Sequence, residues 1–364
     1  MSDDVILVIV VATALAFDFT NGFHDTANVV ATSISTRAMP PRLAVGYAAV
    51  LNFVGAFISL EVAATVAKDV VEAGAITPTV VFAGLIGAIA WNLTTWWFGL
   101  PSSSSHALIG GVVGATIAAA GTSAVFGEGL LGKVLIPAVV APILAFVVGV
   151  IAINVAYGVV GRERPGPVTS GFRFGQVISG GLLALAHGTN DAQKTMGVIT
   201  LALIANGTLS EDASVPFWVV ASAATAIALG TYTGGWRIIR TMGTKIIKMD
   251  TAQGFSAQGA GAAVILSSTH FGFPLSTTQV ISGGVMGSGA GKRLSAVRWG
   301  VAGNIVVAWL LTLPAAAAIG ALTYGICSLF GDNAVGPVVV GAASLAGGTL
   351  VFVRRNRQPV VAEA

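Results

Sequence analysis

Two polar motifs recur along the chain in the same order, and each copy is embedded in long apolar stretches. The first motif begins Gly-x-Pro and continues with hydroxyl residues, as GLPSSSSH from Gly99 and as GFPLSTTQ from Gly272. The second motif surrounds an aspartate, as NGFHDTAN from Asn21 and as HGTNDAQK from His187. Nearly the same length of chain separates the two copies of each motif. Because a long internal repeat reports a structural unit that occurs twice, the sequence predicts a duplicated architecture.

The amino-acid composition indicates that most of the chain lies within a membrane. Of the 364 residues, 55% are hydrophobic and only 9% are charged, whereas a soluble domain carries about 25% charged residues. Helices of about 20 apolar residues cross a bilayer. We therefore expect an all-α polytopic membrane protein. The net charge of +3 does not predict nucleic-acid binding, because the basic residues lie in short loops between apolar stretches and form no basic face.

The positions of the basic residues predict the topology. Cytoplasmic loops of membrane proteins are enriched in Lys and Arg. If the N-terminus lies outside and each Gly-x-Pro segment turns back, most basic residues fall on the inner side, in the stretches 37–42, 162–173, 237–248, 292–298 and 354–357. The sequence thus predicts a multi-pass protein of the plasma membrane with its N-terminus outside and its C-terminus in the cytoplasm.

In the same topology, the second copy of the repeat has the opposite orientation in the membrane to the first. Segments 5–36 and 174–205 are overlong and interrupted by polar residues, whereas 106–120 and 279–290 are too short to cross. We therefore expect broken helices and two re-entrant hairpins, which in an inverted-topology repeat are typical of secondary transporters. The expected divisions are a first half at 1–133, a connecting span and cytoplasmic loop at 134–173, a second half at 174–298, and C-terminal spans with a cytoplasmic tail at 299–364.

The hydroxyl residues after each Gly-x-Pro turn are candidate substrate ligands. They are Ser103, Ser104 and Ser105 in the first copy, and Ser276, Thr277 and Thr278 in the second. Each group starts a short helix, whose unpaired backbone N–H groups and positive dipole end favour an anion. Two such helix starts that enter from opposite faces would point at one central oxyanion. The alternative is that these residues only cap their helices.

The two motif aspartates, Asp25 and Asp191, are candidate ligands of a coupling cation. A charge in the middle of a bilayer costs about 2.5–3.5 kcal/mol even on insertion scales. A carboxylate beside an anion site makes physical sense if a cation lies between them, either Na⁺ or a proton. Backbone carbonyls near Gly22 and Gly188 would supply further oxygens, as would the side chains of Thr26, Asn28, Thr189 and Asn190. The alternative is an aspartate that caps a broken helix.

Three other ionisable residues lie in or near the aspartate motifs. His24 precedes Asp25, and it would carry a proton near neutral pH or form a hydrogen bond between helices. Lys194 would either neutralise part of the charge of an anionic substrate or pair with an aspartate, and we favour the ion pair. Asp18 lies two helical turns before Asp25 on the same helix face, where we expect it to line an outer vestibule.

At these residues the sequence resembles the inorganic phosphate transporter (PiT) family, and FDFTNGFHDTANVVAT at 17–32 with GLPSSSSH at 99–106 is similar to its bacterial low-affinity branch. The resemblance implies phosphate uptake driven by H⁺ or Na⁺, a homodimer, and no other cofactor. It assigns the coupling cation to Asp25 and Asp191 and the substrate to the two hydroxyl groups. His24, where many relatives have Asn, implies the branch that carries neutral metal-phosphate complexes with protons.

Rival functions explain fewer of these features. A symporter of sulfate or a related oxyanion stays open, because no residue excludes a similar tetrahedral anion. A passive anion channel would not place Asp25 and Asp191 near its pathway, since acidic groups repel an anion that no cation accompanies. An intramembrane hydrolase that uses Ser105 and His106 would need two neighbouring helix residues to face each other, which they do not. We therefore expect a transporter and not an enzyme.

Overall fold

The computed structural model describes residues 2–68, 71, 76–210, 212–331 and 333–356. The expected cytoplasmic tail at 357–364 lies outside the described residues, as do several charged residues of the loops. Helices make up nearly all of the described chain, and the expected all-α fold is confirmed. Their bounds are α1 (Ser2–Ser35), α2 (Pro41–Gly55), α3 (Glu61–Lys68), α4 (Pro78–Phe98), α5 (Ser104–Ala120), α6 (Gly127–Gly129), α7 (Ile136–Val160), α8 (Pro165–Ala205), α9 (Phe217–Thr233), α10 (Trp236–Arg240), α11 (Thr251–His270), α12 (Thr277–Lys292), α13 (Trp299–Ser328) and α14 (Val335–Asn356).

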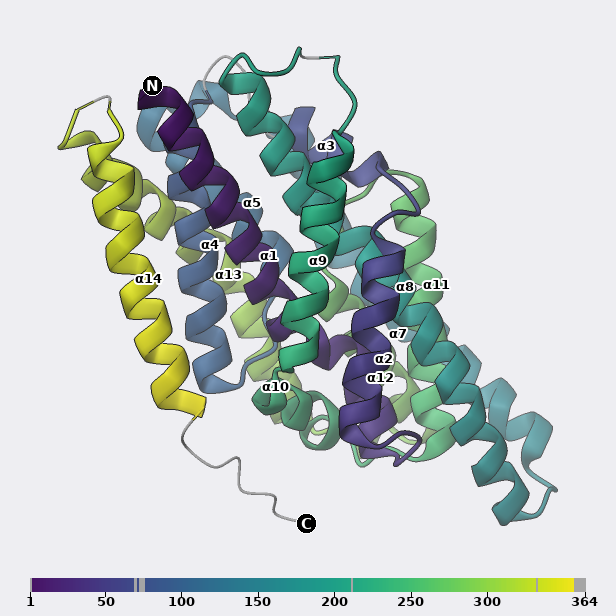
Figure 1. Cartoon of the computed structure of the whole chain (residues 1–364). Coiled ribbons are helices and arrows are strands. Elements are labelled where there is room, and N and C mark those ends of the chain that lie inside the picture. Colours follow the sequence, from purple (N-terminus) through teal and green to yellow (C-terminus); the bar gives the residue numbers. More distant parts are fainter. Residues whose placement is uncertain (1, 69–70, 72–75, 211, 332, 357–364) are drawn as a thin grey trace.

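Several of these helices suit a bilayer by length and composition. Within the described residues, five helical stretches are long and apolar enough to cross, and the bent pair α9 and α10 makes a sixth. The long helices run side by side, and α1 begins at the end of the molecule opposite to that at which α14 ends (Figure 1). Many large apolar side chains of α7 and α13, such as Val159 and Leu310, are exposed, as expected of surfaces that face lipid.

The short helices α5 and α12 both begin after a sharp turn of the backbone. Gly99 and Gly272, which open the two Gly-x-Pro motifs, have φ angles of 67° and 70°. This left-handed conformation is readily adopted only by glycine. The chain then extends for a few residues before Ser103 and Ser276 cap the new helices. The two expected hairpins, α4 with α5 and α11 with α12, are therefore present as turns at the matching positions.

Glycines set the packing of both short helices. A Cβ atom on Gly114 of α5 would lie 2.0 Å from the carbonyl oxygen of Ala317 in α13, and one on Gly287 of α12 would lie 2.1 Å from that of Phe146 in α7. These distances are far too short for a side chain, so the helix backbones are in direct contact. Small residues that permit close backbone approach are the usual basis of helix packing in lipid.

The expected breaks in the two aspartate helices are absent. Both α1 and α8 are helical throughout, and α8 begins at Pro165, nine residues before the expected start. Gly22 and Gly188 serve close packing instead, because a Cβ atom there would lie 2.3 Å from the Ile227 carbonyl oxygen and 2.1 Å from the Asn52 carbonyl oxygen, respectively. The polar residues of the two motifs do not interrupt these helices, because neighbouring helices bury them.

A real break occurs elsewhere, between α9 and α10. The two helices bend by 62° across Gly234 and Gly235. Gly234 has a φ angle of 70°, and a Cβ atom on Gly235 would lie 2.2 Å from the carbonyl oxygen of Phe23. The chain turns at this point because one glycine supplies the left-handed conformation and the next lets the backbone pass close to α1.

Candidate functional site

The two short helices start beside each other in the middle of the molecule. Ser105 Oγ, in the first turn of α5, donates a hydrogen bond of 3.1 Å to the carbonyl of Leu275, just before α12. The side chains of His106 and Gln279, which occupy matching positions in the two motifs, approach to 3.4 Å between Nδ1 and Nε2. Both helix N-termini, with their unpaired N–H groups and partial positive charge, therefore meet in one region.

The first hydroxyl of each group caps its own helix. Ser103 Oγ accepts a hydrogen bond of 3.1 Å from the backbone N–H of His106, and Ser276 Oγ accepts one of 3.3 Å from that of Gln279. Side-chain capping of this kind satisfies an N–H group that the helix leaves unpaired. For Ser103 and Ser276, the structure therefore places the hydroxyl where the capping alternative requires it.

Three of the other four hydroxyls lie near Asp25. Its Oδ1 atom lies 3.3 Å from Ser104 Oγ of α5 and 3.3 Å from Thr278 Oγ1 of α12. Its Oδ2 atom lies 3.5 Å from Thr277 Oγ1. Asp25 is buried, and α1 brings it to the point where α5 and α12 begin. Hydroxyls from two helices that are distant from each other and from α1 in the sequence thus lie around one carboxylate.

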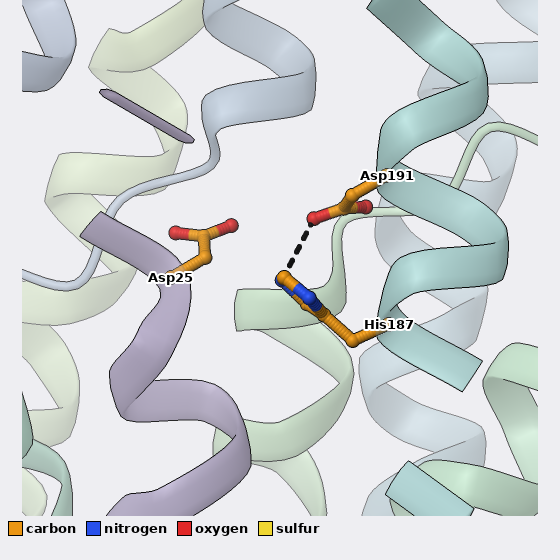
Figure 2. Close-up of side chains that lie close together, drawn as sticks. All are labelled: Asp25, His187 and Asp191. Atoms are coloured by element: carbon orange, nitrogen blue, oxygen red, sulfur yellow. Dashed lines mark ion pairs between the residues drawn. The ribbon is translucent and has the colours of Figure 1, made fainter. Parts of the chain in front are cut away.

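Asp191 lies on the other side of Thr277. Thr277 Oγ1 is 3.1 Å from Asp191 Oδ2, so a single hydroxyl lies between the two aspartates and can donate its proton to only one of them. His187 Nε2 also lies 3.1 Å from Asp191 Oδ2. Figure 2 shows Asp25 pointing from α1 toward His187 and Asp191 of α8. One ligand atom of each of these three residues lies within 4.8 Å of the others, which is a spacing suited to a cation.

Lys194 forms the ion pair that we favoured. Its ammonium group contacts Asp191 Oδ1 one turn away on α8. It also donates hydrogen bonds of 2.6 Å to Ser105 Oγ and 2.7 Å to the carbonyl oxygen of Leu275. The lysine is 1% exposed. A buried ammonium group that finds a carboxylate, a hydroxyl and a carbonyl is well compensated for the loss of water.

His24 links Asp25 to a second pair of hydroxyls. Its Nδ1 atom lies 2.6 Å from Asp25 Oδ1. Its Nε2 atom lies 3.2 Å from Thr95 Oγ1 and 3.4 Å from Ser102 Oγ, and these two hydroxyls are themselves 2.8 Å apart. The imidazole therefore has polar partners at both ring nitrogens and connects the carboxyl group of Asp25 to these two hydroxyls.

The remaining candidate cation ligands lie in different surroundings. Asn28 Nδ2 donates hydrogen bonds of 3.3 Å and 2.9 Å to the hydroxyls of Thr277 and Thr278, and its Oδ1 atom is buried with no partner among the described residues. Thr26 donates to the carbonyl of Gly22 at 2.6 Å, as a helix-packing residue does. Asn190 Nδ2 donates to Thr269 Oγ1 at 2.9 Å. The structure thus brings Asn28 to the site and directs the side-chain donors of Thr26 and Asn190 elsewhere.

Asp18 is not at the surface of a vestibule. It is fully buried, and the side chains of Asn21 and Thr195 lie close to its carboxyl group. Within the described part of the chain, neither carboxyl oxygen has a hydrogen-bond partner, and Asn21 Oδ1 and Thr195 Oγ1 also lack one. The helix-face argument placed Asp18 on the correct side of α1, but the packing of α8 against this face covers it.

Sequence reasoning missed several residues of the site. His187 is one of them, and its position one helical turn before Asp191 is the signal that could have placed it beside that carboxylate. Ser102 and Leu275 directly follow the prolines of the two Gly-x-Pro motifs, and this matching position was the signal that could have placed them at the site. Thr95 carries no local signal, because tertiary packing alone brings it there. Ser105 and His106 form no pair with each other, since Ser105 bonds Leu275 and Lys194, so the arrangement gives a hydrolase no activated nucleophile.

Comparison with known proteins identifies the family. The model of the phosphate transporter family matches residues 21–320, which include both copies of both motifs. The chain belongs to the phosphate transporter family. Its similar relatives are named as transporters, which agrees with the expectation that the chain is not an enzyme.

Several bacterial relatives are similar over most of their length. A probable low-affinity inorganic phosphate transporter of Mycobacterium tuberculosis (strain ATCC 25618 / H37Rv) is 54% identical over 98% of this chain and 85% of its own. Proteins of the same description from Rhizobium meliloti (strain 1021) and Bacillus subtilis (strain 168) are 50% and 45% identical, over 88% and 89% of this chain and 96% and 98% of theirs. The expected resemblance to the bacterial low-affinity branch is confirmed.

A solved structure, described as the sodium-dependent phosphate transporter, has a similar fold. It superimposes with a TM-score of 0.80 at 25% sequence identity, over 89% of this chain and 99% of that chain. The helical membrane architecture of this member of the phosphate transporter family therefore matches that of a solved phosphate transporter.

Proposed function

We propose that this protein is a secondary active transporter that takes up inorganic phosphate by symport with H⁺ or Na⁺. One observation carries the proposal: the hydroxyls at two helix N-termini and two buried aspartates share one site. Ser104, Thr277 and Thr278 contact these carboxylates. The relatives are named phosphate transporters, and the solved neighbour is named sodium-dependent.

The charges of the site explain why an anion would need a cation to enter. The two helix starts attract phosphate through N–H groups and hydroxyls, whereas ionised Asp25 and Asp191 repel it. A cation beside Asp25 would change this balance, because it neutralises that carboxylate and attracts the anion. Binding of either ion then favours binding of the other, which is the thermodynamic basis of coupling.

Two carriers of positive charge fit the Asp25 side of the site. A sodium ion would find oxygen ligands in Asp25, Asn28 Oδ1 and the neighbouring hydroxyls. A proton would be held between His24 and Asp25, whose Nδ1 and Oδ1 atoms are 2.6 Å apart. The resemblance of the His24 motif to the proton-coupled branch supports the second carrier, together with transport of a neutral metal-phosphate complex.

Uptake into liposomes tests this function. Purified protein is reconstituted, and entry of labelled phosphate is measured under an imposed proton gradient and then a sodium gradient, with and without Mg²⁺, and with sulfate as competitor. We expect uptake that requires one gradient and is lost in Asp25→Asn and Asp191→Asn. Uptake that ignores both gradients and both substitutions would favour a channel, and stronger uptake of sulfate would favour another oxyanion.

The domain divisions, the orientation and the oligomeric state remain predictions. We propose inverted halves at 1–133 and 174–298, joined by 134–173 and followed by 299–364, in a homodimer with its C-terminus in the cytoplasm. The matching hydroxyl caps and glycine contacts of α5 and α12 support the repeat. Accessibility of single introduced cysteines to an impermeant reagent tests the orientation, and mass measurement in detergent tests the dimer.

A further inference from the structure

The oxygen atoms around the ammonium group of Lys194 are of the kinds that bind a metal cation. Its ammonium group contacts a carboxylate oxygen of Asp191, a hydroxyl oxygen of Ser105 and the backbone carbonyl oxygen of Leu275. Carboxylate, hydroxyl and non-helical carbonyl oxygens are also the ligands that membrane transporters offer to Na⁺. An ammonium group has three N–H donors, and three oxygens surround it here. Lys194 therefore has no donor left over to reach toward phosphate.

The matching position of the first motif holds a neutral residue. Lys194 follows Asp191 by three residues, and Asn28 follows Asp25 by the same spacing. Asn28 lies beside Thr277 and Thr278, and its buried Oδ1 atom has no partner among the described residues. No lysine or arginine of the described residues pairs with Asp25, whose ionic neighbour is His24. Both aspartates thus contact the Thr277 hydroxyl, but among the described residues only Asp191 also contacts a built-in ammonium group.

We propose that the ammonium group of Lys194 is a tethered cation that occupies the cation position of the Asp191 half, so that a mobile coupling ion binds only on the Asp25 side. The inference rests on the proposed function of the same site and deepens it, because it fixes how many mobile cations these aspartates hold. An amine on the protein supplies the positive charge permanently, without requiring an ion from solution.

Replacement of Lys194 by asparagine, the residue at the matching position of the first motif, tests the proposal. In Lys194→Asn, the oxygens of Asp191, Ser105 and Leu275 lose their cation, and the new amide resembles Asn28. We expect this variant to bind one more sodium ion per chain than the wild type, measured as ²²Na⁺ bound to purified protein at saturation without phosphate. Lys194→Met, which fills the position with an apolar side chain of similar length, should gain no sodium. Lys245→Asn, at an exposed position, is the control.

A second measurement, on Asp191→Asn with Lys194 in place, does not depend on the folding of a Lys194 variant. Because Lys194 occupies the second position, Asp191→Asn should leave the number of bound sodium ions unchanged. Loss of a sodium ion in Asp191→Asn would overturn the proposal, and so would equal sodium binding in folded Lys194→Asn and the wild type. Phosphate uptake by the wild type is a separate readout, so failure of the proposed function is distinguished from failure of this inference.

Discussion

The hydroxyl of Thr278, at the start of α12, lies 3.3 Å from a carboxylate oxygen of Asp25 in the middle of α1. The two residues are far apart in the sequence, and each belongs to a different copy of the repeated motifs. A contact between the hydroxyl motif of one copy and the aspartate motif of the other means that neither copy forms the site alone.

Replacement of Thr278 by valine should weaken phosphate transport, because valine keeps the shape of the side chain and removes the hydroxyl. A hydrogen bond to a charged group contributes about 1.5–3 kcal/mol. We therefore expect at least about a tenfold rise in the phosphate concentration at half-maximal uptake. Thr225→Val, which removes an exposed hydroxyl bonded only to its own helix, is the matched control. Equal uptake curves for the two variants would contradict a role for Thr278.

Replacement of Gly287 by alanine should destabilise the protein. The added methyl group would meet the Phe146 carbonyl oxygen at 2.1 Å, and forced separation of packed elements costs about 1–3 kcal/mol. Gly158→Ala, in the neighbouring helix α7, adds its methyl group where no atom lies within 4 Å. Thermal unfolding in detergent should show a lower Tm for Gly287→Ala and an equal or higher Tm for Gly158→Ala. A Tm for Gly287→Ala that matches the wild type would show that α12 does not depend on this contact.

The pH dependence of stability should include a contribution from Asp250, outside the membrane-spanning helices. Partial burial of its carboxyl group opposes ionisation, but hydrogen bonds from Tyr157, the Gln253 backbone and Lys292 outweigh this and hold its pKa below the ordinary value. A depressed pKa in the folded state stabilises the protein above the unfolded-state pKa of about 3.9, and the contribution is lost as pH falls through the folded value. Tm of the wild type should therefore fall more steeply below about pH 4 than Tm of Asp250→Asn. Parallel curves for the two proteins would refute the assignment.

Replacement of Asp18 by asparagine should lower the rate of transport without lowering the stability of the protein. A buried carboxyl group without hydrogen-bond partners among the described residues is costly to the fold, and ionisable residues inside membranes are usually functional. Asp18→Asn should unfold at the same or a higher temperature than the wild type, yet take up phosphate at a rate lower by about tenfold or more. A stable variant with a full uptake rate would show that Asp18 is dispensable.

The repeated motifs allowed much of the site to be anticipated. Glycine, proline and consecutive hydroxyls have local conformational consequences, so the turns at Gly99 and Gly272 and the helix starts after them follow from sequence alone. The cost of a charge in lipid likewise singled out Asp25 and Asp191. The family and the helical membrane fold agree with these expectations.

Other features depend on packing that no local pattern reveals. Gly22 and Gly188 resembled breaks, but the contacts that decide their role come from α9 and α2. The same holds for Thr26 and Asn190, whose hydrogen-bond partners Thr231 and Thr269 belong to other helices. A sequence shows which side chains are polar, whereas only the assembled helices show which of them meet.

The glycine contacts of α5 and α12 constrain how the site can open to either side of the membrane. Because Gly114 holds α5 against α13 and Gly287 holds α12 against α7, neither short helix can swing away alone without leaving its partner's backbone exposed. We therefore expect each short helix to move together with its partner helix. The pair α5 and α13 meets the pair α12 and α7 near Thr277, where hydroxyls line the surface between them. A hydroxyl can change its hydrogen-bond acceptor at little cost, which suits this surface to a small sliding motion. Alternating access would then be a shear motion along this hydroxyl-lined surface, in which the glycine contacts within each helix pair stay unchanged.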